Sequence, residues 1–456
     1  MARRKKKQPA VMYHEGLRPM RSDCAGLDVG SREMWIDVGI ENSPEPVRKF
    51  DAFTEDLNAM AGWLKSCGIR SVAMESTGVY WISVFQILEA HGIEAVLVNA
   101  AHVKNVSGRK SDWLDCQWIR ILHCYGLLRS SFYPAPEIAV LRSYIRHRQS
   151  LVESAASHIQ HMQKALSLMN LQLHHVISDI TGVTGMKIIR SIVAGQRDAR
   201  QLAAMRDRRI RASEQTIVKA LEGNYRPEHI FQLQQSLELF DFYQNKIEAS
   251  HQQIEAHLQR MDSKADVSKL PEARSGKKTI RNRPQFDVRE QAFRISGVDL
   301  TRIDGIQESA ALSLIAEIGI DMSRWNTEKH FVSWLALCPN NKITGGKVIG
   351  RHTKKSAQRA REILCLCAQS LLDSRSALGA YCRRLCGRLG KPQGITATAH
   401  KLALLVYRMI KLGKDYLDIG QERYEEQFKQ RALKHLARKA KDMGFQLVPV
   451  TENQVP

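Results

Sequence analysis

The sequence predicts an α/β domain near the N-terminus and a mostly helical remainder, and three observations favour this fold class. Up to about residue 136, short apolar runs alternate with amphipathic segments. Two later segments repeat apolar residues at spacings of four and three over many turns. The last third holds further helical patterns around glycine-containing turns. With 456 residues, the chain is long enough for two or three domains.

The N-terminal elements are predicted from their periodicity and their caps. Apolar alternation indicates strands, and Thr54 is expected to cap the first helix. The expected order is strand Leu27–Val29, strand Met34–Ile40, strand Val47–Phe50, helix Thr54–Lys65, strand Ser71–Met74, helix Val79–His91, strand Ala95–Val98 and a helix that carries Asp112 and Asp115. Three strands followed by alternating helices and strands is the order of RNase H-like domains, although other α/β folds share it.

Four carboxylates stand out within this region. Asp28 interrupts an apolar strand between two glycines, and Glu75 closes a strand that looks buried. Asp112 and Asp115 are three residues apart on a helix, so their side chains share one face. Buried carboxylates need a partner or a metal, and Mg2+ prefers such oxygen ligands. RNase H-like nucleases hold divalent metals with acids placed in this way.

The four acids therefore predict a site for Mg2+ or Mn2+, which carboxylates alone do not distinguish. The alternative is that each acid is an ordinary solvated side chain. Two nearby acids are left out of the set: Asp23 as a charge at a strand end, and Asp37 as an outward-facing residue.

The composition favours a nucleic-acid partner. Lys and Arg number 68 against 47 acids, a formal net charge of +21, which attracts phosphate backbones or anionic surfaces. No apolar run is long enough to span a bilayer, and no apolar segment of a secretion signal follows the basic start. The nine cysteines lack paired C-x-x-C units, and Cys365, Cys367, Cys382 and Cys386 indicate reduced core thiols rather than zinc ligands. We therefore expect a cytoplasmic, nucleoid-associated protein without a membrane partner.

The middle of the chain is predicted to form two long helices packed as a coiled coil. Each helix has a seam of nine positions, and Arg148, Gln244 and His251 are its polar exceptions. The seam positions are Leu141, Ile145, Arg148, Val152, Ala155, Ile159, Met162, Leu166 and Met169, and Leu233, Leu237, Phe240, Gln244, Ile247, His251, Ile254, Leu258 and Met261. An insert from His174 to Glu228 separates them, which suggests an antiparallel hairpin and a dimerisation arm. A plain helical bundle within one subunit is the alternative.

The C-terminal third contains three features with a possible DNA-binding role. Leu300–Gly319 is typical of a helix-hairpin-helix, whose turn offers N–H groups to phosphates. Cys338–Lys347 is expected to be a loop in which Thr344 precedes two glycines that allow close approach to a phosphate. A final helix places Arg431, Lys434, Arg438 and Lys441 on one stripe. For the Thr344 loop, a simple flexible turn is the alternative.

These segments, in this order, resemble the DEDD transposases of the insertion-sequence one-ten family. The N-terminal motifs are Gly26–Gly30 (GLDVG), Met74–Trp81 (MESTGVYW) and Arg109–Asp115 (RKSDWLD). The C-terminal motifs are Ile303–Ile306 (IDGI), Ala316–Gly319 (AEIG), Trp334–Pro339 (WLALCP) and Gly346-Lys347. The resemblance spans roughly Ala25 to Leu417.

The resemblance implies an enzyme that excises and inserts a mobile element, guided by a noncoding bridge RNA that pairs with donor and target DNA. It implies metal ligation by Asp28, Glu75, Asp112 and Asp115, and dimers that assemble into a tetramer. The family's nucleophilic serine falls on Thr344, which implies a 5′-phosphothreonine intermediate. Threonine is more hindered than serine, so slower or absent activity, or a role for Ser333 or Ser356, remains an alternative.

The expected organisation follows from pattern and resemblance together. It comprises a basic arm (1–24), a RuvC-like domain (25–136), a coiled-coil arm with its insert (137–262), a linker (263–290), a transposase domain (291–420) and a basic helical tail (421–456). Two other functions stay open. One is a metal-dependent junction nuclease without a covalent step. The other is a nucleic-acid-binding protein that has lost catalysis.

Overall fold

The computed structural model describes residues 19–76, 78–99, 112–272, 282–353, 358–413 and 415–448, without the side chains of residues 112, 342 and 351–353. The chain forms two compact units, Met1–Tyr133 and Pro134–Pro456. The first is a mixed α/β unit and the second is mostly helical, as the sequence predicts.

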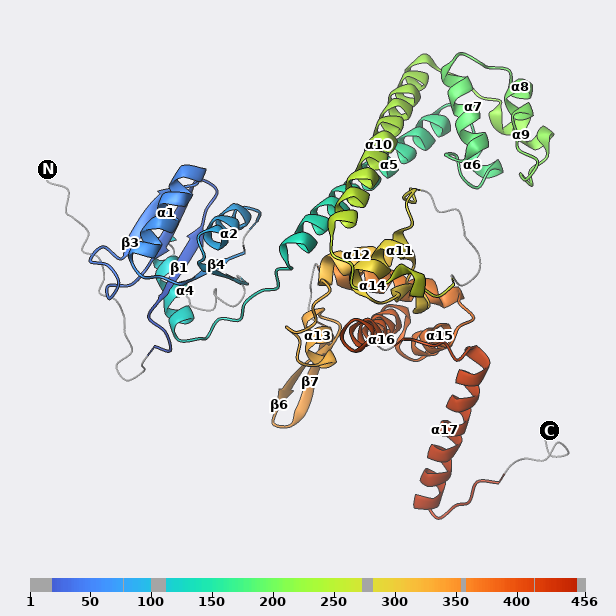
Figure 1. Ribbon diagram of the computed structural model, residues 1–456. Helices are drawn as coiled ribbons and strands as arrows, with labels where there is room; N and C mark the ends of the chain where they lie inside the picture. The colour runs from blue at the N-terminus through green and yellow to red at the C-terminus, as the bar shows by residue number, and fades with distance from the viewer. Residues whose placement is uncertain are drawn as a thin grey trace. The chain divides into compact units, whose positions relative to one another are not determined.

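The first unit is built on a five-stranded sheet in the order β3-β2-β1-β4-β5 (Figure 1). Strands β1 to β3 pair in antiparallel fashion, whereas β4 pairs with both β1 and β5 in parallel. The elements are β1 Cys24–Val29, β2 Glu33–Asp37, β3 Val47–Asp51, α1 Thr54–Ser66, β4 Ser71–Glu75, α2 Trp81–Ala90, β5 Glu94–Val98 and α4 Asp112–Cys124. Antiparallel neighbours need only short turns, and the parallel strands are joined through helices, as such pairs require.

The two faces of this sheet are covered by different helices. Leu27 on β1 and Met74 on β4 are paired neighbours that are fully buried in one core with residues of α1 and α2. Ala73, one position earlier on β4, packs instead with Ile119 of α4. Because side chains alternate along a strand, Asp28 and Glu75 belong to the face that α4 covers.

Four local predictions in the first unit are wrong. The second strand ends at Asp37 rather than Ile40, because Gly39 at φ +84° turns the chain. Thr54 is the first residue of α1, whose N-cap is Phe53 without a side-chain hydrogen bond. Asp37 does not face outward, since it is 1% exposed. The helix expected from Val79 begins at Trp81.

The second unit begins with two long antiparallel helices, α5 (Pro136–Leu168) and α10 (Pro227–Arg260). The carbonyl of Glu137 near the start of α5 lies 2.8 Å from His257 Nε2 near the end of α10. The predicted seam positions are buried or half-buried on both helices. The polar pair in the seam meets, because Arg148 Nε donates to His251 Nε2 over 2.8 Å. Burial lowers the pKa of His251, which favours the neutral ring that can accept this bond.

The insert between the long helices is itself helical. It holds α6 (Leu173–Val176), α7 (Val183–Val193), α8 (Ala199–Ala204) and α9 (Glu214–Leu221), which share one hydrophobic core with the adjoining ends of α5 and α10. The insert is therefore a folded cap on the helical pair.

The rest of the second unit is a cluster of helices with one β-hairpin. The elements are α11 Val288–Ser296, α12 Glu308–Ile318, α13 Glu328–Trp334, β6 Pro339–Thr344, β7 Lys347–Thr353, α14 Arg359–Ser370, α15 Ala377–Leu389, α16 Lys391–Leu412 and α17 Gln421–Asp442, with short 3-10 turns at Val267–Lys269, Leu300–Arg302 and Leu371–Asp373. The expected loop Cys338–Lys347 is wrong, because most of it is the strand β6 and its turn. None of the described helices combines the length and hydropathy that a bilayer-spanning segment needs.

Candidate metal centre and exposed hydroxyl

Helix α4 lies directly against strand β1 because Gly26 has no side chain. A Cβ built on Gly26 would lie 2.2 Å from both the backbone nitrogen of Arg120 and the carbonyl oxygen of Cys116. Ordinary van der Waals contact begins near 3.4 Å. Any larger residue at this position would therefore push α4 away from the strand that carries Asp28.

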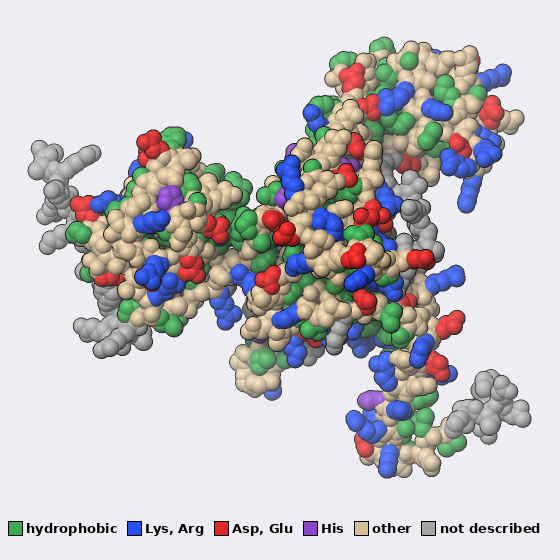
Figure 2. Space-filling model, viewed as in Figure 1, with side chains coloured by type: hydrophobic (Ala, Val, Ile, Leu, Met, Phe, Trp, Pro, Cys, Tyr) green, Lys and Arg blue, Asp and Glu red, His purple; other side chains and the backbone are tan. Residues whose placement is uncertain are grey.

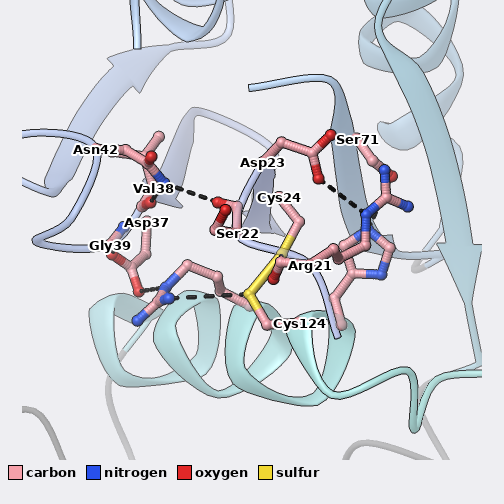
Figure 3. Close-up of a disulfide and its surroundings, with 12 residues drawn as sticks. Arg21, Ser22, Asp23, Cys24, Asp37, Val38, Gly39, Asn42, Ser71 and Cys124 are labelled. Carbon is pink, nitrogen blue, oxygen red and sulfur yellow. Dashed lines mark hydrogen bonds and ion pairs between the residues drawn. A yellow bond between two sulfur atoms is a disulfide. The ribbon is translucent and has the colours of Figure 1, made fainter. Parts of the chain in front are cut away.

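Polar contacts fix the position of α4 along the sheet. Arg120 is 3% exposed, and its Nε donates to Asp37 on β2 over 2.7 Å. A second nitrogen of the same guanidinium donates to Glu41 over 3.0 Å. Further along the helix, His123 Nε2 lies 2.8 Å from the hydroxyl of Ser71, the first residue of β4. A disulfide between Cys24 and Cys124 joins the start of β1 to the end of α4 (Figure 3).

These contacts set Asp28 level with the first turn of α4. Cys24 meets Cys124 and Gly26 meets the Cys116–Arg120 turn, so strand and helix run in opposite directions. Four residues of strand from Cys24 to Asp28 cover about 13 Å. Nine residues of helix from Cys124 back to Asp115 also cover about 13 Å. Asp28 and Asp115 therefore lie at about the same level along the interface between β1 and α4.

Glu75 reaches the same edge from the neighbouring strand. The parallel register pairs Leu27 with Met74, so Asp28 and Glu75 are the next residues on adjacent strands. Residues abreast on paired strands have Cβ atoms about 5 Å apart. Asp28, Glu75 and Asp115 are each half-buried, and each makes at least one interaction with its surroundings.

The electrostatics around Cys116 support this convergence. Burial is the main cause of the raised pKa of the Cys116 thiol, and the charges of Asp37, Asp28 and Asp115 raise it further. A thiolate at this position would be repelled by all three carboxylates. The charges of Asp28 on β1 and Asp115 on α4 therefore both act on Cys116, whereas the charge of Asp37 is already paired with Arg120.

The predicted four-acid set is only partly described. Asp112 begins α4, but its side chain lies outside the described residues, as do Lys104, Arg109 and Lys110. Among the side chains that are described, no group of three His, Cys, Asp or Glu residues is close enough to hold a metal ion. The structure places Asp28 and Glu75 on adjacent strands of one face, and Asp115 on the helix that covers this face. Metal ligation by all four stays a prediction.

Thr344 lies at the tip of the β6–β7 hairpin. Its Cα pairs with that of Lys347, which leaves Gly345 and Gly346 as a two-residue turn. Both glycines have positive φ, 54° and 76°, as a type I′ turn requires. Thr344, Lys347 and the turn are exposed, together with the apolar side chains of Ile343 and Ile349. An exposed hydroxyl beside a lysine and next to glycines is accessible to a phosphate.

The base of the hairpin is held firmly by the helices beneath it. Leu335 and Leu337, which lead into β6, are buried, and His400 Nδ1 of α16 lies 3.3 Å from the Leu337 carbonyl. On α13, Glu328 receives two hydrogen bonds of 2.5 and 2.8 Å from Arg408 of α16. The tip that carries Thr344 therefore extends from a fixed support. Of the two alternative hydroxyls, Ser333 is exposed on α13, and Ser356 lies outside the described residues.

Sequence reasoning missed the residues that position the site. Arg120, His123 and Cys124 lie in a helix whose sequence signals only amphipathicity, and the disulfide partner of Cys124, Cys24 on β1, is 100 residues away. Gly305, in the turn of the predicted helix-hairpin-helix, packs where a Cβ would lie 2.7 Å from the carbonyl oxygen of Cys367. Its φ of +88° and this close approach give it a structural role.

Comparison with protein families agrees with both halves of this arrangement. A family profile described as Transposase, of the DEDD IS110 type, matches residues 25–171. A second, described as Transposase IS116/IS110/IS902 family, matches residues 299–383. The chain belongs to the IS110 family of transposases. A search of curated proteins finds no match.

Each of the two matched regions contains one of the candidate sites described above. The first covers the sheet from residue 25, α4 and all of α5, and so includes all four predicted acids. The second covers α12, α13, the β6–β7 hairpin and α14, and so includes Thr344. The IS110 transposase is therefore an enzyme that acts on DNA, and both of its candidate reactive sites lie within family-specific regions.

Proposed function

We propose that this IS110 transposase excises and inserts a mobile element through a covalent protein–DNA intermediate, guided by a bridge RNA. The observation that carries the proposal is the placement of Asp28 and Glu75 on adjacent strands of one face, covered by the helix that carries Asp115, in a chain that also presents Thr344 on an exposed hairpin. Each site on its own suits a simpler nuclease or a binding protein. Together they suit phosphoryl transfer with a protein nucleophile.

The proposal treats the first unit as an RNase H-like domain of the RuvC type. Its strand order, with three antiparallel strands and then two parallel ones, supports this assignment. So does the location of the acids, since Asp28 is on the central strand β1 and Glu75 ends the adjacent parallel strand β4.

Asp28, Glu75, Asp112 and Asp115 would hold Mg2+ or Mn2+. Half-buried carboxylate oxygens are the donors that these hard cations prefer, so the residues fit the ion. A bound divalent cation would supply charge stabilisation to the oxygens of the scissile phosphate. The contribution of the chain is to fix the carboxylates in advance, through Gly26, Arg120 and the Cys24–Cys124 disulfide.

Thr344 would be the nucleophile. Its Oγ1 attacks the phosphorus, the hydroxyl proton leaves, and the bond from phosphorus to the 3′-oxygen breaks, which gives a 5′-phosphothreonine and a free 3′-hydroxyl. A 3′-hydroxyl from another strand then attacks the same phosphorus and releases Thr344. Each step replaces one phosphate ester bond by another, so no high-energy cofactor is needed. Lys347, opposite Thr344 in the hairpin, would contact the phosphate.

The helical arm would bring subunits together. The heptad seams of α5 and α10 are buried between the two helices of one chain, so contacts between subunits would use other faces of the arm. The exposed Phe231, Leu239 and Phe242 of α10 support its use as a dimerisation arm in a tetrameric complex. With a net charge of +21, the chain would hold bridge RNA and both DNAs by their backbones, while base pairing supplied sequence specificity.

The test is adduct formation with a suicide DNA substrate, cognate RNA and Mg2+. Wild-type protein should form a covalent adduct that resists denaturation, and peptide mapping should place it on Thr344. Thr344→Ala should abolish the adduct and Thr344→Ser should retain or increase it. Ser333→Ala is the matched control, because Ser333 is an exposed hydroxyl of the same unit. An undiminished adduct with Thr344→Ala would exclude this residue.

Two other functions make different predictions. A junction nuclease without a covalent step, which the strand order would also suit, gives free cleaved ends and is indifferent to Thr344→Ala. A binding protein without catalysis would suit threonine in place of serine. It would bind DNA equally well in chelator and would cleave no strand in the presence of any metal. Half-buried acids at one strand edge disfavour the binding protein, because binding alone does not need them.

A further inference from the structure

Within the described ranges, the contacts that attach the last helix, α17, to α15 of the second unit lie near its beginning. Arg383 donates to Gln421 over 2.8 Å, and the Arg384 guanidinium lies 4.8 Å from the ring centroid of Tyr424. The same guanidinium lies 3.8 Å from the ring centroid of Phe428. These cation–π contacts fix the first two turns of α17 on α15.

Beyond Phe428 the helix is strongly basic and exposed. Residues 429–441 contain six Lys or Arg and no Asp or Glu. All six cations are exposed, and no ion pair joins any of them to a carboxylate within the described ranges. In Figure 2, Lys and Arg side chains gather along this helix, at the lower right of the view. A run of unpaired charge of one sign favours a partner of the opposite sign.

The charges are arranged by face. Arg431, Lys434, Arg438 and Lys441 follow spacings of three, four and three, so they form one stripe along the helix. Leu433 and Leu436 are on the other side, with exposed fractions of 45% and 50%. The other two cations, Lys429 and Lys439, are off the stripe, more than about 90° around the helix from its centre.

We propose that this basic stripe binds the sugar–phosphate backbone of duplex DNA. From Arg431 to Lys441 the stripe spans about 15 Å at a rise of 1.5 Å per residue. One DNA strand presents about four phosphates over that length, at 3.4 Å each. Four cations thus match about four phosphates. The stripe adds sequence-independent binding outside the regions that the transposase profiles match, since those end at residue 383.

DNA fits this surface better than a lipid bilayer does. Helices that lie in a membrane interface present large apolar or aromatic side chains along the face opposite their charges. Here the distal apolar face has only two leucines among alanines, and the one phenylalanine of α17, Phe428, stacks on Arg384. The exposed Phe445 and Leu447 come after the end of the helix and do not extend this face. The inference rests on the proposed function only in taking DNA as the partner.

The test compares two variants of the full chain that remove the same charge from the same helix. Lys434→Gln with Lys441→Gln removes two cations from the stripe, and Lys429→Gln with Lys439→Gln removes two from outside it. Lysine and glutamine have similar helix propensities, so circular dichroism should be unchanged in both. Binding to a 30-base-pair duplex of arbitrary sequence is measured by fluorescence anisotropy in EDTA, over a series of salt concentrations.

The stripe variant should lower the slope of log K against log salt by about 1.8, which is about 0.9 for each phosphate that is no longer neutralised. The off-stripe variant should lower it by less than about 0.5. Equal slopes for the two variants would overturn the proposal. The proposal would also be overturned if the stripe variant bound anionic vesicles or RNA more weakly than the wild type does but bound duplex DNA equally well. Because EDTA prevents cleavage, a chain that binds by the stripe but forms no adduct would refute the catalytic proposal only.

Discussion

The position of α4 on β1 can be tested by a single added methyl group. In Gly26→Ala the new Cβ would lie 2.2 Å from backbone atoms of both Cys116 and Arg120. Neither contact can be relieved by rotating a side chain, since both atoms belong to the backbone of α4. The helix must therefore move, together with Asp115.

The size of the effect follows from these distances. To bring each contact from 2.2 Å to the 3.4 Å at which ordinary packing begins, α4 must shift by about 1.2 Å. Metal sites tolerate deviations of about 0.2 Å in ligand distance, so cation binding should be lost. Overpacking of this kind costs about 1–3 kcal/mol, and the contacts of Arg120 and His123 that hold α4 in place put the loss toward the upper end.

The assay is urea unfolding, together with strand cleavage in Mg2+. Gly62→Ala is the control, because Gly62 lies in helix α1 with nothing within 4 Å of the position of its Cβ. Replacing a helical glycine by alanine stabilises by up to about 1 kcal/mol. The two substitutions should therefore act with opposite signs on stability, and only Gly26→Ala should abolish cleavage. If Gly26→Ala unfolds and cleaves like the wild type, α4 does not pack on β1 as described.

Three further predictions concern the supports of the two sites. Asp37→Ala should lower the free energy of unfolding by about 3–5 kcal/mol, because Arg120 stays buried without its main partner; Asp37→Leu with Arg120→Met should recover most of this in the same urea titration. Burial is the main cause of the lowered pKa of His123, so the folded state favours the neutral ring. The contribution of this ring to the stability of the fold is complete above the ordinary pKa of 6.5 and is lost as pH falls below that value. His123→Asn should reduce the difference in urea midpoint between pH 7.5 and pH 5.5, and an unchanged difference would contradict this. Gly345→Asn should preserve adduct yield, since Asn-Gly suits a type I′ turn, whereas Gly345→Val, strained by about 1–2 kcal/mol at φ 54°, should lower it.

Local periodicity was sufficient to predict most elements of both units. Asp28 could be assigned to the inside of a strand and Glu75 to a strand end, because the apolar runs around them are short and bounded by glycine or by helix signals. The seams of α5 and α10 were visible because few structures other than packed long helices produce a heptad repeat that persists over thirty-odd residues.

Contacts between distant segments could not be predicted in this way. Asp37 was assigned to the solvent by alternation, yet it is buried because Arg120, 83 residues later, pairs with it. An ion pair of this kind depends on which helix covers the sheet, and this cannot be predicted from the residues near Asp37 in the sequence. The β6–β7 hairpin was missed for a different reason: Lys342 and its polar neighbours mask the alternation, although the two glycines after Thr344 are a hairpin signal in themselves.

The central claim is that Asp28, Glu75, Asp112 and Asp115 share one cation, and calorimetric titration of the full chain with Mn2+ tests it most directly. Wild-type protein should bind Mn2+ saturably, and Asp28→Asn and Asp115→Asn should each lose this binding. Asp23→Asn should keep it, because Asp23 is paired with Arg21 at 3.1 Å at the opposite end of β1. Saturable binding that survives in Asp28→Asn, or no saturable binding by the wild type, would contradict the account.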